Sequence, residues 1–82
     1  MNKHEIIEKT NNFLIEEIEV DPIRIVPQAD LREDLGIDSL DFVDIVVLVE
    51  RIFGFKLKAE EMTEVKTLAQ FYDYIQGKLS TK

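Results

Sequence analysis

Residues 39–53 read SLDFVDIVVLVERIF, and Gly54 follows them directly. Apolar side chains recur at the three- and four-residue spacing that places them on one face of an α-helix. The β-branched run at 45–47 could belong to a strand, but strict alternation of apolar and polar residues is missing. Glycine adopts the left-handed backbone that often ends a helix. The stretch therefore predicts a helix over 39–53.

Two apolar stripes run along this predicted helix. The broader stripe is expected to face the core and comprises Phe42, Ile45, Val46, Val49, Ile52 and Phe53. A second, displaced stripe has an apolar centre and an acidic rim, formed by Leu40, Val43 and Val47 with Asp41, Asp44 and Glu50. Either the preceding loop covers this second stripe, or the stripe is a docking strip for a helix or groove of another protein.

Upstream of this helix, the sequence predicts one helix and a long loop. Asn2 and Glu5 have capping-box spacing, and an apolar stripe then extends to Ile18. Asp21-Pro22 is expected to end that helix, because proline restricts the residue before it. Residues 22–37 lack a clean period but are rich in apolar side chains, so they predict a loop that is pinned onto the core.

Downstream, two more helices are expected. A short one is predicted over 59–64, and a longer one begins with the capping pair Thr67 and Gln70. The longer helix has one apolar stripe, made of Leu68, Phe71, Tyr72, Ile75 and Leu79. The tail at 80–82 is expected to fray. The fold class is therefore all-α: one domain over 1–82, a small four-helix bundle with a long first loop and a short third helix.

Charge and composition exclude several classes of function. The 82-residue chain has a formal net charge of −7, and residues 30–50 contain seven acidic side chains against the single base Arg32. Such a field repels phosphate backbones and anionic lipid, so neither nucleic acid nor a membrane is an expected partner, whereas basic protein surfaces are. Without cysteine, an apolar run of membrane-spanning length or a signal-peptide pattern, the expected location is the cytoplasm.

The seven residues 34–40, DLGIDSL, lead into the central predicted helix. This motif closely resembles the phosphopantetheine attachment site of acyl carrier proteins, and the resemblance extends over nearly the whole chain in length, acidity and helix order. It implies that Ser39 receives 4′-phosphopantetheine from coenzyme A through a separate phosphopantetheinyl transferase. It also implies that Asp38 assists the modification and that the arm carries acyl groups as thioesters. Asp38 is also a natural N-cap for the predicted helix, whose N-terminus suits an attached phosphate.

The same resemblance implies further roles for the central helix. Leu40, Asp41, Val43, Asp44, Val47 and Glu50 would bind basic docking surfaces of acyl-transferring and synthase enzymes, and Phe42 and Val46 would line an acyl pocket. The carrier is expected to be a monomer. The chain departs from the usual fatty-acid pattern at Phe42, at Val47 and at Arg51, where a small residue, a methionine and an acid are more common. A specialised acyl carrier is therefore as plausible as a fatty-acid carrier.

Two alternative functions remain open for the same residues, and two others are not expected. An amino-acid carrier, of the D-alanyl or peptidyl type, would use identical attachment chemistry, and an unmodified helical interaction module would leave Ser39 free. An enzyme is not expected, because the only histidine, His4, lies far away in a frayed N-terminus and no other base accompanies the serine. The acidic residues also lack the spacing of a calcium loop, so no metal is expected.

Overall fold

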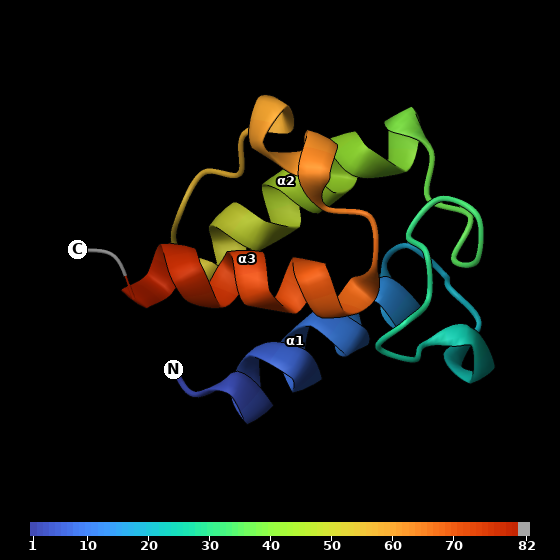
Figure 1. Cartoon of the computed structure of the whole chain (residues 1–82), viewed down its shortest axis with the longest axis horizontal. Coiled ribbons are helices and arrows are strands. Elements are labelled where there is room, and N and C mark those ends of the chain that lie inside the picture. The colour runs from blue at the N-terminus through green and yellow to red at the C-terminus, as the bar shows by residue number, and fades with distance from the viewer. Residues whose placement is uncertain (81–82) are drawn as a thin grey trace.

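The computed structural model describes residues 1–80, which form helices joined by loops and contain no β-strand. The elements in chain order are α1 (Lys3–Glu16), η1 (Pro22–Arg24), α2 (Ser39–Phe53), η2 (Ala59–Glu64) and α3 (Leu68–Ser80), where η denotes a 3₁₀ helix. Figure 1 shows α1 and α3 side by side and antiparallel, with α2 crossing the pair. The predicted all-α fold, with three longer helices and a short third one, is confirmed.

Local capping signals set most of the helix boundaries. Asn2 Oδ1 accepts a hydrogen bond from the Glu5 N–H at 2.8 Å, and the Glu5 carboxylate accepts one from the Asn2 N–H, so α1 begins with a capping box. Thr67 and Gln70 exchange the same pair of bonds at the start of α3. Gly54 ends α2 with a left-handed φ of 82°. The expected fraying of the tail is wrong for Ser80, which is helical, and otherwise falls outside the described residues.

The first helix ends earlier than its apolar stripe predicted. Helix α1 stops at Glu16, and Glu19 adopts a left-handed φ of 67°, which turns the chain back toward the core. Ile18 therefore lies beyond the helix instead of on its stripe, and the buried Val20 donates its N–H to the Leu14 carbonyl at 2.8 Å. The Asp21-Pro22 pair does not end α1; instead, Asp21 caps the short helix η1.

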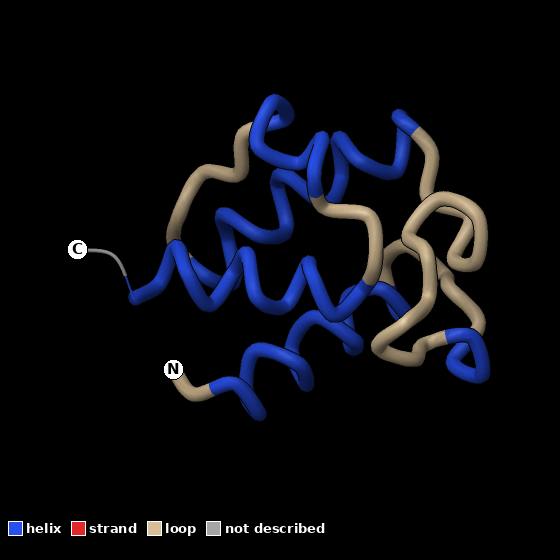
Figure 2. Tube along the Cα trace, viewed as in Figure 1, coloured by secondary structure: helices blue, strands red, loops and turns tan. Residues whose placement is uncertain are grey.

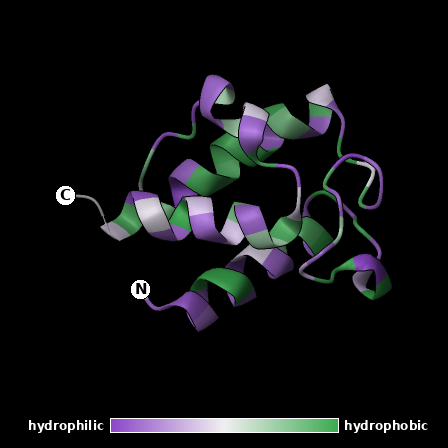
Figure 3. Cartoon of the chain, viewed as in Figure 1, coloured by the Kyte–Doolittle hydropathy of each residue, from purple (hydrophilic) through white to green (hydrophobic). Residues whose placement is uncertain are grey.

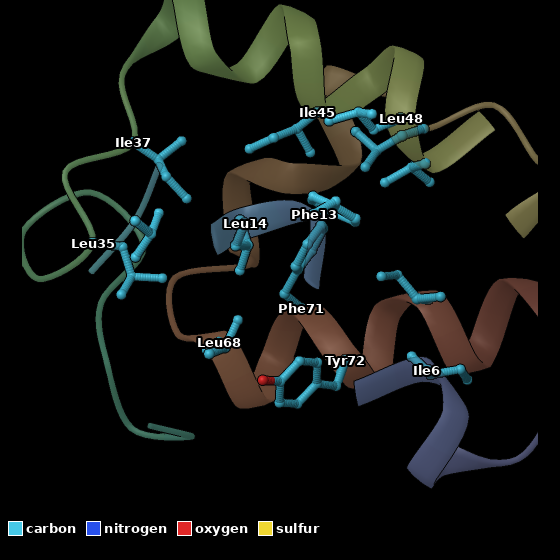
Figure 4. Packing of buried hydrophobic residues seen from close by; sticks show 14 of the residues in the cluster. Ile6, Phe13, Leu14, Leu35, Ile37, Ile45, Leu48, Leu68, Phe71 and Tyr72 are labelled. Atoms are coloured by element: carbon cyan, nitrogen blue, oxygen red, sulfur yellow. The ribbon is translucent and has the colours of Figure 1, made fainter. Parts of the chain in front are cut away.

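One hydrophobic core joins the three α-helices. Figure 4 shows core side chains from all three converging, among them Ile6, Phe13 and Leu14 of α1, Ile45 and Leu48 of α2, and Phe71 and Tyr72 of α3. In Figure 3, hydrophobic residues extend along most of α2. The predicted core face of α2 needs one correction. Leu48 is buried although the stripe omitted it, whereas Phe42, Val46 and Ile52 are only partly buried against the core.

The irregular segment between α1 and α2 gathers at the end of the molecule away from the N-terminus (Figure 2). Its backbone is tied to the start of α3. Leu31 N–H donates to the Lys66 carbonyl at 2.8 Å, and Leu68 N–H donates to the Ala29 carbonyl at 2.9 Å. The loop is therefore pinned as predicted, although Ile23 and Val26 are exposed instead of packed on the core. None of the helices within residues 1–80 combines the length and the apolar character that a membrane span requires.

Candidate functional site

Asp38 is the N-cap of α2. Its Oδ1 accepts hydrogen bonds from the N–H groups of Leu40 and Asp41, each at 3.0 Å. The Asp41 carboxylate in turn accepts the Asp38 N–H at 3.4 Å, which completes a capping box. The two carboxylates together cap the N-terminus of α2, and the predicted cap role of Asp38 is confirmed.

Ser39, the first residue of α2, takes no part in this cap. Its side chain is exposed, and neither its hydroxyl nor its N–H makes a hydrogen bond within residues 1–80. Fewer N–H groups are free near Ser39 than an uncapped helix N-terminus would offer, because Asp38 already accepts hydrogen bonds from those of Leu40 and Asp41. The Ser39 N–H and the positive end of the helix dipole remain available for a negative charge. An accessible hydroxyl with a free neighbouring donor fits a phosphodiester.

The turn that presents Ser39 is held by its own carboxylates. Asp34 Oδ2 accepts the Asp30 N–H at 2.7 Å, and Asp30 Oδ1 accepts the N–H groups of Arg32 and Glu33 at 2.9 and 2.8 Å. Gly36 adopts a φ of 71°, a left-handed value that other residues rarely adopt. Asp34 and Gly36 of the motif therefore help to shape the turn that leads to the exposed Ser39.

A cavity of about 450 Å³ opens beside Ser39. One side is formed by the start of α2 and by the loop at 30–33, and the other by the segment that contains η2. The lining residues are Asp30, Leu31, Arg32, Glu33, Ile37, Asp38, Ser39, Phe42, Ala59, Met62, Thr63, Val65 and Lys66. The structure thus brings Ser39 and Phe42 to one cavity. Val46 packs against the core but does not line this cavity.

The docking strip on α2 is open to solvent. Leu40, Val43 and Val47 are 79%, 61% and 50% exposed, so the loop at 22–37 does not cover them. Asp44 and Glu50 beside them are exposed as well, whereas Asp41 is half-buried by its role in the cap. The structure therefore excludes the explanation that the loop covers the second stripe. The stripe is an exposed apolar surface with an acidic rim.

The site has none of the groups that would make Ser39 a nucleophilic catalyst. Such a serine needs a base within hydrogen-bond reach, and the Ser39 hydroxyl has no such partner among residues 1–80. His4 lies in the first turn of α1 instead of in a frayed terminus, and it is exposed. The arrangement can present a hydroxyl to another enzyme, but nothing in it activates that hydroxyl.

Two parts of the site were not found from the sequence. The walls contributed by Arg32 and Glu33 and by the η2 segment depend on contacts between distant parts of the chain. No periodic pattern reports such contacts. The only related indication in the sequence was the capping pair at 67 and 70. It sets the start of α3 and therefore the position at which the segment containing η2 must end.

Comparison with known proteins agrees with this geometry. A family model described as "Phosphopantetheine attachment site" matches residues 12–75. An acyl carrier protein of Thermosynechococcus vestitus is 38% identical over 80 residues, which cover 98% of this chain and 99% of the relative. An acyl carrier protein of Coprothermobacter proteolyticus is 35% identical over the full length of both chains. "Acyl carrier protein 2" of Ralstonia nicotianae is 32% identical, over 98% of this chain and 99% of its own.

The named relatives align with 98% or more of the chain, and the family model covers both the exposed serine and the cavity beside it. The family consists of carriers without catalytic activity, in keeping with a serine that lacks a base. Its members hold their cargo on a covalently attached phosphopantetheine. The chain belongs to the acyl carrier protein family.

Proposed function

We propose that Ser39 carries 4′-phosphopantetheine, attached through a phosphodiester to its hydroxyl, and that the chain presents acyl thioesters to biosynthetic enzymes. The observation that carries this proposal is that one residue at the start of α2 caps the helix while its neighbour keeps a free hydroxyl. Asp38 supplies the cap, so the Ser39 hydroxyl is exposed and free of hydrogen bonds within residues 1–80. When bound, the arm supplies a terminal thiol to which the acyl group is joined.

The cavity beside Ser39 is suited to shelter part of that cargo. Its inner surface includes the apolar side chains of Leu31, Ile37, Phe42 and Met62. Burial of each methylene group in such surroundings is favourable by roughly 0.8 kcal/mol. Phe42 is only partly buried, so its ring forms a wall of the cavity and is not locked in the core. We place the acyl pocket here, with Phe42 as the residue that limits its depth.

The docking strip is the surface offered to partner enzymes. Its exposed apolar centre is typical of surfaces that are buried in a complex, and its acidic rim matches enzymes with basic docking surfaces. The partners would be the phosphopantetheinyl transferase and the acyl-transferring and synthase enzymes. The named relatives are acyl carriers, which favours acyl cargo over amino-acid cargo. Fatty-acid biosynthesis or a related acyl pathway is the setting we propose.

Intact mass spectrometry tests the attachment. The purified chain is incubated with coenzyme A, Mg²⁺ and a broad-specificity phosphopantetheinyl transferase, and one arm should be added. The chain has only two serines, so Ser80→Ala is a matched control that should still be modified, whereas Ser39→Ala should not. An arm that is still added to the Ser39→Ala variant would overturn the assignment.

A second variant separates the two roles proposed for Asp38. Asp38→Asn keeps a side-chain oxygen that can accept the N–H groups of Leu40 and Asp41, because asparagine is as good an N-cap as aspartate. It removes only the carboxylate charge beside Ser39. If that charge assists the transferase, Asp38→Asn should slow arm addition while leaving the free energy of unfolding nearly unchanged. An unaltered rate of addition would restrict Asp38 to capping.

A further inference from the structure

The η2 segment forms a wall of the cavity beside Ser39, yet η2 contains no buried residue of its own. Ala59, Met62 and Thr63 of η2 line the cavity, on the side away from α2. Lys58 stands at the N-cap position without a side-chain hydrogen bond. In Figure 1, η2 is joined to α2 and α3 by extended connections. An element of this kind has little intrinsic stability, because short 3₁₀ helices have poor hydrogen-bond geometry.

A hydrogen-bonded cluster of side chains ties this wall to α3, in addition to the apolar packing of Met62 against the core. The Glu61 carboxylate accepts a hydrogen bond from the Tyr74 hydroxyl at 2.6 Å. It also binds Lys78 Nζ, at 2.8 Å from one oxygen and 3.0 Å from the other. Glu61 and Lys78 are about one-third exposed, so solvent screens the pair only in part. Such charge-assisted hydrogen bonds are roughly twice as strong as neutral ones.

The partners of Glu61 are themselves fixed. The ring of Tyr74 contacts the ring of Phe55 edge to face, with centroids 6.2 Å apart, and Lys78 Nζ lies 5.7 Å from the Tyr74 ring centre. Both partners stand on α3, which is anchored by four buried residues. Burial and the bond to Glu61 raise the pKa of Tyr74 to about 12, so its hydroxyl remains a hydrogen-bond donor at neutral pH. The wall is therefore fastened to a rigid support.

We infer that Glu61, held by Tyr74 and Lys78, is a positioning residue that sets the size of the cargo cavity. Its side chain holds η2 against α3, and the opposite face of η2 bounds the space next to Ser39. With the fastening intact, the wall fixes the length of acyl chain that the folded protein can shelter. When the fastening is loosened, η2 can move away from α2 and longer chains can enter. This inference rests on the proposed function, because it assigns the cavity to the acyl cargo.

The variants Tyr74→Phe and Glu61→Gln weaken the fastening with little change in shape. Tyr74→Phe keeps the ring that contacts Phe55 and removes only the hydroxyl that binds Glu61. Glu60→Gln is the matched control, because it removes the same charge from the same short helix at an exposed side chain that bonds nothing within residues 1–80. Amide hydrogen exchange of the unmodified protein should be about five- to tenfold faster over 59–65 in the two test variants, as expected for the loss of one hydrogen bond of ordinary net strength at a partly exposed site.

The second measurement uses the protein loaded at Ser39 with saturated acyl chains of increasing length. Melting temperature should rise with chain length in the wild type and then level off, because a sheltered chain stabilises only the folded state. In Tyr74→Phe and Glu61→Gln the levelling should move to longer chains, whereas Glu60→Gln should follow the wild type. A general loss of stability would lower every melting temperature without changing the acyl length at which the melting temperature levels off.

The possible outcomes distinguish a failure of the positioning role of Glu61 from a failure of the proposed attachment at Ser39. An unchanged levelling length in both test variants overturns the positioning role of Glu61, whether or not exchange over 59–65 becomes faster. Exchange that stays at the wild-type rate overturns it as well. If Ser39 accepts no arm in the wild type, the proposed function itself fails, and the intact-mass measurement reports that failure before any chain length is compared.

Discussion

The carboxylate of Asp38 caps α2, and the hydroxyl of the adjacent Ser39 is thereby left exposed and unbonded within residues 1–80. Serine and aspartate are both strong N-cap residues, so either could have served. Because the aspartate does so, the serine is not needed to hold the helix. Its substitution and its modification should therefore cost the fold little.

Cap variants test this division directly. Asp38→Ala leaves the N–H groups of Leu40 and Asp41 without their acceptor and should lower the free energy of unfolding by about 1 kcal/mol. Ser39→Ala should stay within about 0.5 kcal/mol of the wild type, as for most surface substitutions. Urea denaturation measures both. If Ser39→Ala lost as much as Asp38→Ala, the hydroxyl would have to share in the cap.

Phe42 should determine how much acyl chain the cavity accepts. Removing a fully buried phenylalanine ring costs 3–5 kcal/mol, so Phe42→Ala, at a partly buried position, should cost roughly 2 kcal/mol in the unmodified protein. Long acyl chains should then restore part of the loss at about 0.8 kcal/mol per buried methylene. Thermal unfolding across an acyl series is the measurement. Ile52→Ala is the control, because Ile52 is also partly buried on α2 but lies outside this cavity.

If the wild type keeps gaining stability out to long chains and Phe42→Ala gains no faster, Phe42 does not limit the pocket.

The acidic rim of the docking strip should speed association with the transferase. Asp44→Lys should slow it roughly fivefold at low salt, since an exposed rim charge contributes at most about 1 kcal/mol. Glu8→Lys makes the same change in charge at an exposed position on α1, far from the strip in sequence, and should have a smaller effect. Stopped-flow association at several ionic strengths checks both variants. An association rate that does not depend on salt would leave the acids with no steering role.

Thr10 should be a weak point of the core. Its side chain is fully buried within α1, and its hydroxyl oxygen has no hydrogen-bond partner among residues 1–80. A buried polar group without a partner costs about 1–3 kcal/mol. Thr10→Val has nearly the same shape without the hydroxyl and should raise the free energy of unfolding by about 1 kcal/mol. A destabilised valine variant, measured in urea, would show instead that the hydroxyl is satisfied in solution.

The Glu61 cluster should also make stability depend on pH. Hydrogen bonds from Lys78 and then from Tyr74 lower the pKa of Glu61 below its ordinary value of 4.5. A carboxyl with a lowered pKa in the folded state contributes stability above the pKa of the unfolded chain, and this contribution is lost as the pH falls through the folded value. The stability difference between wild type and Glu61→Gln should therefore shrink in acid below about pH 4.5.

Unfolding curves measured from neutral pH into acid give that difference. Wild-type and Glu61→Gln curves that stay parallel throughout would contradict the contribution of Glu61.

Features with a local cause could be predicted from the sequence. The caps at Asn2, Asp38 and Thr67 and the end at Gly54 depend on residues within a few positions of one another, and all four were found. The end of α1 could not be predicted in this way. The chain turns at Glu19, which has a left-handed φ, and the following Val20 is buried in the core. Nothing in the local pattern signals that turn.

The site divides in the same way. The motif at 34–40 indicated the serine and its cap, and the spacing along α2 indicated a second apolar stripe, whose exposure is known only from the structure. The cavity was not foreseen in detail, since its walls come from the loop at 30–33 and from η2, which are separated by all of α2. Likewise, the bonds from Tyr74 and Lys78 to Glu61 join residues whose partnership depends on how η2 and α3 pack.

The ties between the first loop and α3 also bear on the order in which the chain acquires its shape during synthesis. Residues 29–31 are held by the backbone of Lys66 and Leu68, which leave the ribosome only after the whole of α2. A nascent chain that has exposed Ser39 but not yet Leu68 lacks those bonds, and contacts between distant segments form late and slowly. The serine thus emerges before the ties between its loop and α3 can form, and a transferase that requires those ties would act only after Leu68 has left the ribosome.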